Sequence, residues 1–273
     1  TTPAAMEKQA RQAGKIIEAF DPTVLVTIDD NAFRLVGMNY AGSDRPVVFC
    51  GLNGQPEAYN RQARIMESRD KPGHNITGVY ELLHIVDAIR VHRTVFPGLK
   101  SIRILVDRDS ATGKAIQQQV LQELKILPSD QWTMEVVPSL EAYRNALVRA
   151  NNDPDVGAIY PVALALKDAG GKVHTAPQIF DLTLRVSKKP EMALNYAFCR
   201  MGLFGGAAVD FHAMGKQAGK MVVRIFKGTR PGSIAIEEAR EYALAFNLDR
   251  AQALGITIPE EVLAAADDIF VSR

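Results

Sequence analysis

The feature that most constrains this chain is an alternation of short apolar runs with stretches of helical periodicity. The run "TVLVTI" at 23–28 is short, β-branched and apolar, which is typical of a strand covered on both faces in a parallel sheet. Similar runs lie at 46–52, 101–107, 133–138, 156–161, 192–198, 205–211 and 242–247. Helical patterns separate them, at 56–68, 80–95, 111–126, 139–150, 177–187, 212–227 and 258–268. The alternation predicts an α/β fold with parallel sheets, right-handed crossovers and helices on both faces.

The start of the sequence predicts a helix that precedes the first strand. Thr2 is a suitable N-cap and Pro3 is favoured at the first helical position. Apolar residues then recur at helical spacing as far as Phe20, and Asp21 and Pro22 end the pattern.

The size and composition indicate a folded protein, and we expect two domains. The 273 residues exceed what one ordinary domain needs, and 47% hydrophobic with 23% charged residues allow a buried core. With 32 basic against 31 acidic residues, the chain has no net field that attracts nucleic acid or an anionic membrane. No apolar stretch is long enough for a membrane span, and no signal sequence is recognisable in a chain that opens on Thr1. We therefore expect a small molecule or another protein as the partner.

The cysteines and histidines indicate neither a disulfide nor a metal site. Cys50 and Cys199 each lie in an apolar segment, without a CxxC pair or a histidine at ligand spacing. We interpret both as buried thiols. His84 and His92 lie on one predicted helix with no third ligand in view, so no metal is expected.

Polar residues gather where the first predicted strand ends. In "VTIDDNAFRLVG", Asp29, Asp30 and Asn31 follow the strand directly. Ligands of open α/β sheets bind outside the carboxyl ends of the strands, so these side chains are expected to face a binding cleft. The alternative is that Asp30 or Asn31 caps a helix that starts near Ala32, but a single cap does not need three polar residues in a row. The polar residues that are not needed for capping indicate a ligand-binding site.

Other predicted strands end in similar groups: Gly51, Asn53 and Gln55 after the second, Asp107 and Asp109 after the third, and Tyr160 in the fifth. Each of them, taken alone, also suits a turn or a cap. Their common placement is what favours a shared site.

The motifs of nucleotide-binding and catalytic sites are absent from the sequence. "DRDSATGKA" has Arg108 where a phosphate loop needs its first glycine and Ala115 where it needs Ser or Thr. No GxGxxG follows a strand and no GxSxG elbow occurs, so no cofactor is expected. An α/β hydrolase or sugar-modifying enzyme with Asp29 or Asp109 as general base is the least favoured alternative, because no nucleophile accompanies these acids.

The C-terminal part of the chain resembles a known family. "MGKQAGKM", "KGTRP", "FNLDRAQALGI" and "IPEEVLAAAD" are similar to the C-terminal motifs of ABC transporter substrate-binding proteins of the tryptophan/tyrosine type. "PGHNITGVYEL" resembles a crossing segment of that family. The resemblance covers essentially the whole chain and is most specific at its C-terminal end. It implies a type I periplasmic binding fold, in which three crossover segments join two Rossmann-like lobes around a ligand.

The resemblance also implies the lobe boundaries. Lobe one is expected at 1–78 and 204–240, and lobe two at 79–203 and 241–273. The family begins with a strand, a helix and a second strand before the helix seen here at Pro3, so we expect this segment of lobe one to be missing from the sequence. The candidate site is then incomplete.

The candidate ligand-binding residues follow from this mapping. Lobe one contributes Asp29, Asp30, Asn31 and Asn53, lobe two contributes Tyr80, Glu81, Asp107, Asp109 and Tyr160, and Phe204 and Asp210 flank the second crossing. The aromatic rings either stack on a ligand or pack the hinge. The carboxylates suit a ligand that carries an ammonium group.

The implied function is that of a receptor without catalytic activity. It closes on a small ligand, which is an amino acid, aromatic ones included, or a similar small polar metabolite, and delivers it to the membrane permease of an ABC transporter. The segments "DDNAFR" and "CGLNGQPEAYN" are more polar than their counterparts in the family, which indicates a different ligand. A monomer in the periplasm, or an extracytoplasmic lipoprotein, is expected. The alternative is the ligand-sensing input of a signalling system.

Overall fold

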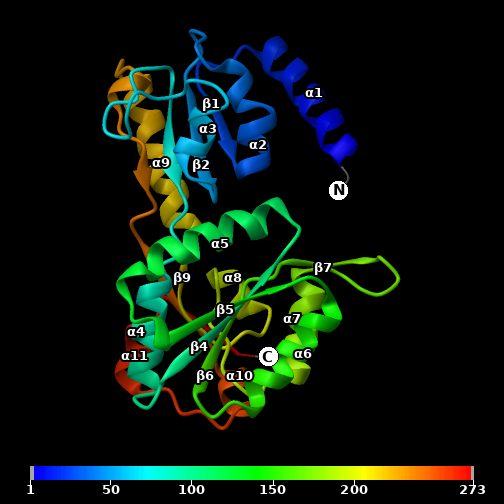
Figure 1. Ribbon diagram of the computed structural model, residues 1–273. Coiled ribbons are helices and arrows are strands. Elements are labelled where there is room, and N and C mark those ends of the chain that lie inside the picture. Colours follow the sequence, from blue (N-terminus) through cyan, green and yellow to red (C-terminus); the bar gives the residue numbers. More distant parts are fainter. Residues whose placement is uncertain (1–2, 272–273) are drawn as a thin grey trace. The chain divides into compact units, whose positions relative to one another are not determined.

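The computed structural model describes residues 3–271, in which the chain forms two compact units (Figure 1). Unit one comprises residues 1–82 and 211–241, and unit two comprises residues 83–210 and 242–273. The chain therefore passes between the units three times, after Leu82, Asp210 and Glu241. Helix α1 (Pro3–Phe20) begins at the predicted position, while its predicted N-cap, Thr2, lies outside the described residues.

Unit one contains a four-stranded parallel sheet in the order β1-β2-β3-β10. The strands are β1 (Leu25–Ile28), β2 (Val47–Leu52), β3 (Ile76–Tyr80) and β10 (Glu237–Glu238). Helices α2 (Asp30–Leu35) and α3 (Pro56–Asn60) follow the first two strands, and α9 (Phe211–Phe226) packs against β2 and β3. Every residue of β2 and β3 is buried, as expected for the centre of a parallel sheet.

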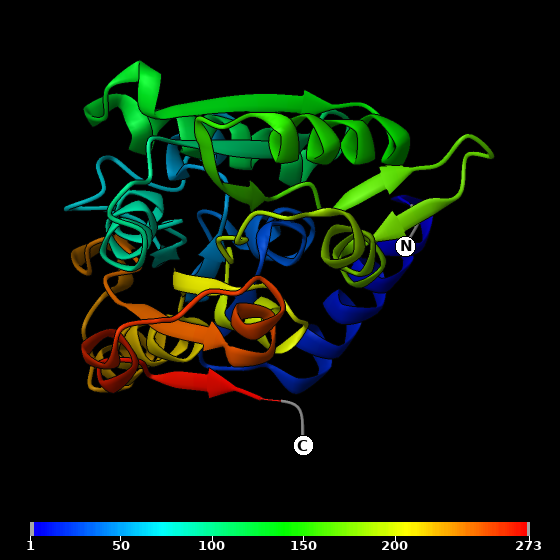
Figure 2. The ribbon, with the colours of Figure 1, turned by 90° about the horizontal axis from the view of Figure 1, so that it is seen from below.

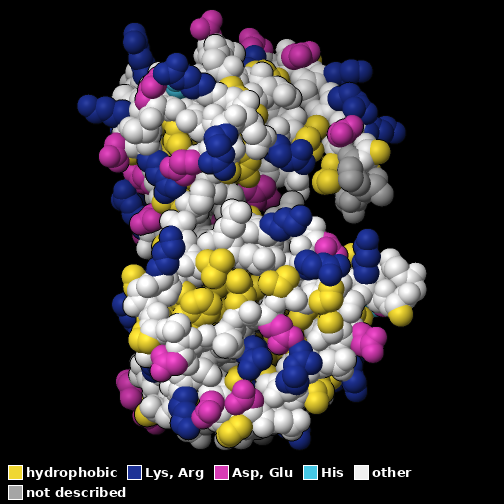
Figure 3. All heavy atoms as spheres, viewed as in Figure 1, with side chains coloured by type: hydrophobic (Ala, Val, Ile, Leu, Met, Phe, Trp, Pro, Cys, Tyr) yellow, Lys and Arg dark blue, Asp and Glu magenta, His cyan; other side chains and the backbone are white. Residues whose placement is uncertain are grey.

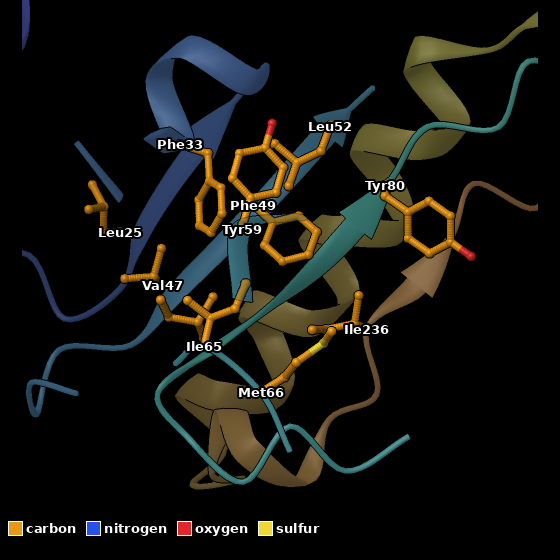
Figure 4. Close-up of a cluster of buried hydrophobic side chains, with 11 residues drawn as sticks. Leu25, Phe33, Val47, Phe49, Leu52, Tyr59, Ile65, Met66, Tyr80 and Ile236 are labelled. Carbon is orange, nitrogen blue, oxygen red and sulfur yellow. The ribbon is translucent and has the colours of Figure 1, made fainter. Parts of the chain in front are cut away.

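The core of unit one is rich in aromatic side chains. Phe33 packs against Phe49 and Tyr59, with ring centroids 5.0 and 5.2 Å apart. Figure 4 shows these rings together at the centre of the cluster, whereas the Tyr80 ring points away from them toward the side of β10. Tyr80 thus lies at one end of the cluster, where its hydroxyl contacts Glu238 of β10.

Two elements of unit one are poorly covered. Strand β1 ends the sheet, and its alternate side chains Val26 and Ile28 are 45% and 69% exposed. No described side chain of α1 from Ala4 to Phe20 is buried, and Phe20 is 78% exposed. Among the described residues, strand β1 therefore pairs with a neighbouring strand along one edge only, through β2.

Unit two contains two three-stranded sheets, ordered β5-β4-β6 and β12-β11-β9. Their strands are β4 (Ser101–Asp107), β5 (Trp132–Val137), β6 (Val156–Pro161), β9 (Gly205–Val209), β11 (Tyr242–Asn247) and β12 (Asp268–Phe270). All pairs are parallel except β9 with β11. The helices are α4 (Ile85–Val95), α5 (Ala111–Glu123), α6 (Leu140–Asn152), α7 (Ala176–Val186), α8 (Tyr196–Arg200), α10 (Leu248–Ala253) and α11 (Glu260–Ala264).

A short segment links the two sheets of unit two. Glu191 forms a parallel bridge with Ile159 of β6, and Met192 forms one with Gly205 of β9. The Glu191 carboxylate is fully buried and binds the guanidinium of Arg250 from α10, which is 10% exposed. This buried ion pair lies at the seam of the two sheets, which is the place where Glu191 and Met192 bridge β6 and β9.

The surface of unit two carries two further features. The hairpin of β7 (Ala165–Lys167) and β8 (Val173–Thr175) projects from the rest of the unit in both ribbon views (Figures 1 and 2). Figure 3 shows apolar side chains gathered on the visible face of unit two. Its exposed apolar residues include Leu121, Ile126 and Val136.

The predicted α/β fold class, with parallel sheets flanked by helices, is confirmed. One predicted strand is wrong: in 192–198 only isolated bridges at Met192 and Asn195 form, and helix α8 begins at Tyr196. Three predicted helices are too long. The helix predicted at 80–95 begins at Ile85 as α4, because Tyr80 still belongs to strand β3. Helix α3 ends at Asn60 because the Asn60 side chain accepts hydrogen bonds from the Ile65 and Met66 amides, and the helix at 258–268 is the short α11 followed by β12.

Candidate functional site

The backbone of Asp29 is the most unusual feature at the carboxyl end of the unit-one sheet. Its φ of 75° and ψ of 158° lie in a region that is almost exclusive to glycine. The Asp29 amide donates to Cys50 O of β2 at 3.0 Å, and Asp29 O accepts from the Phe33 amide of α2 at 3.1 Å. The strand and the helix thus hold this residue on both sides. Such strain costs about 1–3 kcal/mol and is concentrated at binding and catalytic sites.

The carboxylate of Asp29 lies in surroundings that disfavour its negative charge. It lies at the surface, yet partial burial of the carboxylate, together with the charge of Asp30, raises its pKa. The backbone amides of Asp30 and Asn31 oppose this shift. A cationic ligand would favour the ionised form of the Asp29 carboxylate and would offset the repulsion from the Asp30 carboxylate.

Asp30 holds the loop after β2 in place. Its Oδ2 accepts from the Asn53 amide and from Asn53 Nδ2, both at 3.1 Å, and its Oδ1 accepts from the Gly54 amide at 3.0 Å. The Tyr59 hydroxyl donates to the same Oδ1. Burial, followed by the hydrogen bond to Asp30, raises the pKa of Tyr59. Asp30 therefore organises the strand ends through contacts within the protein.

The amide group of Asn53 is only partly used by this arrangement. Its Nδ2 donates to Asp30, whereas within residues 3–271 no hydrogen bond reaches its Oδ1. An acceptor oxygen at the end of β2 thus accompanies the Asp29 carboxylate at the end of β1. Two acceptors suit a ligand that presents hydrogen-bond donors.

An arginine that the sequence did not single out orders the ends of β2 and β3. Arg69 donates to both carboxylate oxygens of Glu57, at 2.7 and 2.6 Å, and to Gln55 Oε1 at 2.9 Å. It also donates to the Tyr80 hydroxyl at 2.6 Å and lies over the Tyr80 ring, 4.6 Å from the centroid. Bidentate and stacked contacts of this kind are specific to arginine. No spacing in "MESRDKPG" could have indicated them.

Tyr80 and Glu81 belong to unit one, whereas the predicted boundary assigned them to lobe two. The reason is that β3 pairs with β2 and β10 as far as Tyr80, and the Glu81 amide still donates to Leu52 O. The Tyr80 hydroxyl donates to Glu238 Oε2 at 3.1 Å. Burial raises the pKa of Tyr80 to about 12, an effect that Arg69 opposes. Glu81 is 4% exposed.

Asn31 faces a different part of unit one. It is exposed, accepts a hydrogen bond from Arg34, and lines an apolar groove between α1 and α2. The structure therefore brings Asp30 and Asn53 into direct contact beside Asp29, while Asn31 lies on the α1 side of α2.

In unit two, Asp107 and Asp109 have different surroundings. Asp107 is 2% exposed, and its Oδ1 accepts from the Ser110 amide at 2.9 Å, so that it shapes the turn into α5. Ser110 caps α5 by accepting from the Gly113 amide. Asp109 is exposed and pairs with its neighbour Arg108, whose hydrogen bond lowers the pKa of Asp109.

The two predicted aromatic contacts of unit two are buried in this structure. Tyr160 is 1% exposed at the end of β6. Phe204 is 0% exposed and packs against His92, Phe96 and Phe246, with centroids 5.7 Å away in each case. Asp210 is half-buried and is the last residue of unit two before the second passage.

Residues 3–271 contain no cluster of three or more His, Cys, Asp or Glu side chains arranged to hold a metal ion. Within the same range, no helix combines the length and the apolar character that crossing a bilayer requires. Cys50 and Cys199 are free, buried thiols in the structure.

Comparisons with known proteins decide the family. The profile of the family described as ABC transporter substrate binding protein matches residues 5–270. The chain belongs to this family. Its members bind substrates and are not enzymes, so the relevant partners are a small molecule and an ABC permease. No curated protein matches the chain.

Solved structures confirm the fold of this substrate-binding protein. An ABC domain from Streptococcus pneumonia in complex with L-Trp aligns with a TM-score of 0.69 and 22% identity, over 97% of this chain and 84% of that one. A conserved domain protein from Vibrio cholerae gives 0.70 and 22%, over 98% and 84%. The ligand-free, open structure of a substrate binding protein with adhesive properties from Clostridium difficile gives 0.73 and 13%, again over 98% and 84%.

Proposed function

We propose that this substrate-binding protein is an extracytoplasmic receptor that binds an amino acid or a similar small polar metabolite and delivers it to the permease of an ABC transporter. The observation that carries the proposal is the strained Asp29 backbone at a strand end. An aspartate in a glycine-only conformation is retained only when the surrounding structure holds it there, and the side chain is then available for binding. A glycine would fit this backbone without strain, and it would lack the carboxylate.

The chemistry of the strand ends favours a ligand with an ammonium group. The Asp29 carboxylate supplies the charge and Asn53 Oδ1 supplies a neutral acceptor, while Asp30 is occupied by four donors of the protein. A charge-assisted hydrogen bond from an ammonium group to Asp29 is about twice as strong as a neutral one. The L-Trp complex of the Streptococcus protein supports an amino acid as the ligand class.

The proposed mechanism requires no catalysis. An open form samples a closed form, ligand contacts made in the closed form shift the population, and the permease recognises that form. A ligand that binds both forms equally would shift nothing, so the proposal requires contacts that form on closure. The proposed receptor is a monomer located outside the cytoplasm.

The variant Asp29→Gly tests the proposal through two opposite effects. We expect it to raise the unfolding free energy of unit one by about 1–3 kcal/mol, because the strain is relieved. We expect it at the same time to lower affinity for the ligand by at least about tenfold, because the carboxylate is lost. Urea denaturation and calorimetric titration with the ligand that co-purifies, identified by mass spectrometry, measure the two effects.

Asp21→Gly is the matched control. Asp21 also has a positive φ, 47°, but it precedes β1 at the opposite end of the strand and pairs with Arg45 at the surface. This control should leave ligand affinity unchanged. If Asp29→Gly bound the ligand as tightly as the unmodified protein does, the strained aspartate would have no part in binding.

A further inference from the structure

One flank of α9 carries a row of positively charged side chains. Lys216, Lys220 and Arg224 occupy every fourth position, and residues with this spacing lie on one face of a helix. The buried residues of the helix are Met214, Ala218, Met221 and Ile225, so that a different face packs on the sheet. The three cations are exposed on the side of α9 that faces away from the sheet.

These cations line a groove that a side chain of α9 bridges. The groove has a volume of about 260 Å³, and its opposite wall is the segment 237–241. Gln217 spans it: Nε2 donates to Glu237 Oε2 at 2.7 Å and to Glu238 O at 3.0 Å, and Oε1 accepts from the Arg240 amide at 3.4 Å. The α9 helix and the facing segment are thus tied together by one side chain.

The charges in the groove do not balance. Arg240 lies 3.0 Å from Glu237 Oε1, so that both oxygens of Glu237 are occupied by Gln217 and Arg240. Glu241 is the second carboxylate of the lining. Within residues 3–271, Lys216, Lys220 and Arg224 form no salt bridge. Like charges four residues apart on a helix destabilise it, and a bound anion would reverse that effect.

We propose that this groove binds a phosphate group. Arginine and lysine side chains that line one groove can donate to the several oxygens of phosphate, and an arginine such as Arg224 can donate two parallel hydrogen bonds. The site is formed by α9 and the segment 237–241, it includes none of the candidate ligand-binding residues at the strand ends, and it does not depend on the proposed function. The phosphate belongs either to a soluble molecule or to a lipid headgroup.

Titration of the full-length protein with inorganic phosphate and pyrophosphate, followed by calorimetry at low and high salt, tests the soluble source. We expect binding that weakens as salt rises, and a loss of at least about tenfold in affinity in the double variant Lys220→Gln/Arg224→Gln. Glu241→Gln should tighten binding, because it removes a repulsive carboxylate from the groove. The control Lys8→Gln/Lys15→Gln removes two cations from exposed positions on α1 and should have no effect.

Sedimentation with vesicles tests the lipid source. Binding to phosphatidylglycerol vesicles that is lost in Lys220→Gln/Arg224→Gln, without binding of free phosphate, assigns the groove to a headgroup and supports the proposal. The proposal is overturned if neither probe binds, or if the double variant binds both probes as the unmodified protein does.

Discussion

Arg250→Met is expected to lower the unfolding free energy of unit two by about 3–5 kcal/mol, because it leaves a buried carboxylate without its partner. Arg250 donates to Glu191 through Nε at 3.0 Å and Nη2 at 2.5 Å, and Glu191 is fully buried. The same guanidinium donates to Leu184 O at 3.2 Å and Ser187 O at 2.9 Å. Its loss therefore removes a donor from two carbonyl groups and leaves the buried Glu191 charge without a cation, while the Phe204 amide still donates to Glu191 Oε2 at 3.4 Å.

The measurement is urea denaturation followed by tryptophan fluorescence. Trp132 is the only tryptophan of the chain and lies in β5, so its emission reports on unit two. Arg90→Met is the matched control: Arg90 pairs with Asp87 in the same unit but is 68% exposed, and its loss should cost less than about 1 kcal/mol. The double variant Glu191→Met/Arg250→Met should recover much of the stability. Equal losses in Arg250→Met and Arg90→Met would contradict this account of the seam.

Gly205→Ala is expected to be at least as damaging, at about 4 kcal/mol or more. A Cβ at this position would lie 2.1 Å from Ala245 O of the neighbouring strand β11, and the φ of Gly205 is 117°. The obstructing atom is backbone, so no side-chain rotation relieves the overlap. The β9–β11 pair must separate to accept the alanine.

Gly98→Ala provides the control for backbone entropy. It lies in unit two, where an added Cβ would meet nothing within 4 Å, and we expect a change within about 1 kcal/mol in either direction. Trp132 fluorescence during urea denaturation serves for both variants. A Gly205→Ala protein as stable as Gly98→Ala would show that the close approach of β9 and β11 is not required.

The strands that the sequence predicted well are those buried on both faces. The runs at 101–107 and 156–161 coincide with β4 and β6, because a covered parallel strand is a continuous apolar run, and the run at 242–247 coincides with β11, which pairs parallel with β12 and antiparallel with β9. The run at 192–198 has the same composition, yet it forms bridges and then a helix. Short apolar runs do not distinguish a strand from a buried helical turn. The sequence indicates strand β3 only as a crossing segment, because Gly73 and Gly78 interrupt its apolar pattern.

The candidate site was only partly accessible from the sequence. The position of Asp29 and Asp30 after an apolar run correctly indicated a strand end. The different roles of the two residues could not be predicted, because they depend on a backbone torsion angle at Asp29 and on partners of Asp30 as distant as Tyr59. The contacts of Arg69 depend in the same way on residues brought together by folding. The part played by the remaining candidate residues in ligand binding stays a prediction.

The most direct test of the account is thermal unfolding of the full-length protein in the presence of a panel of metabolites that includes the aromatic and other amino acids, organic acids, bases and sugars. A receptor predicts that at least one compound with an ammonium group raises Tm progressively with its concentration, since binding to the folded state alone shifts the unfolding equilibrium. An unchanged Tm across the whole panel would contradict the proposal that this chain is a receptor for a small polar ligand.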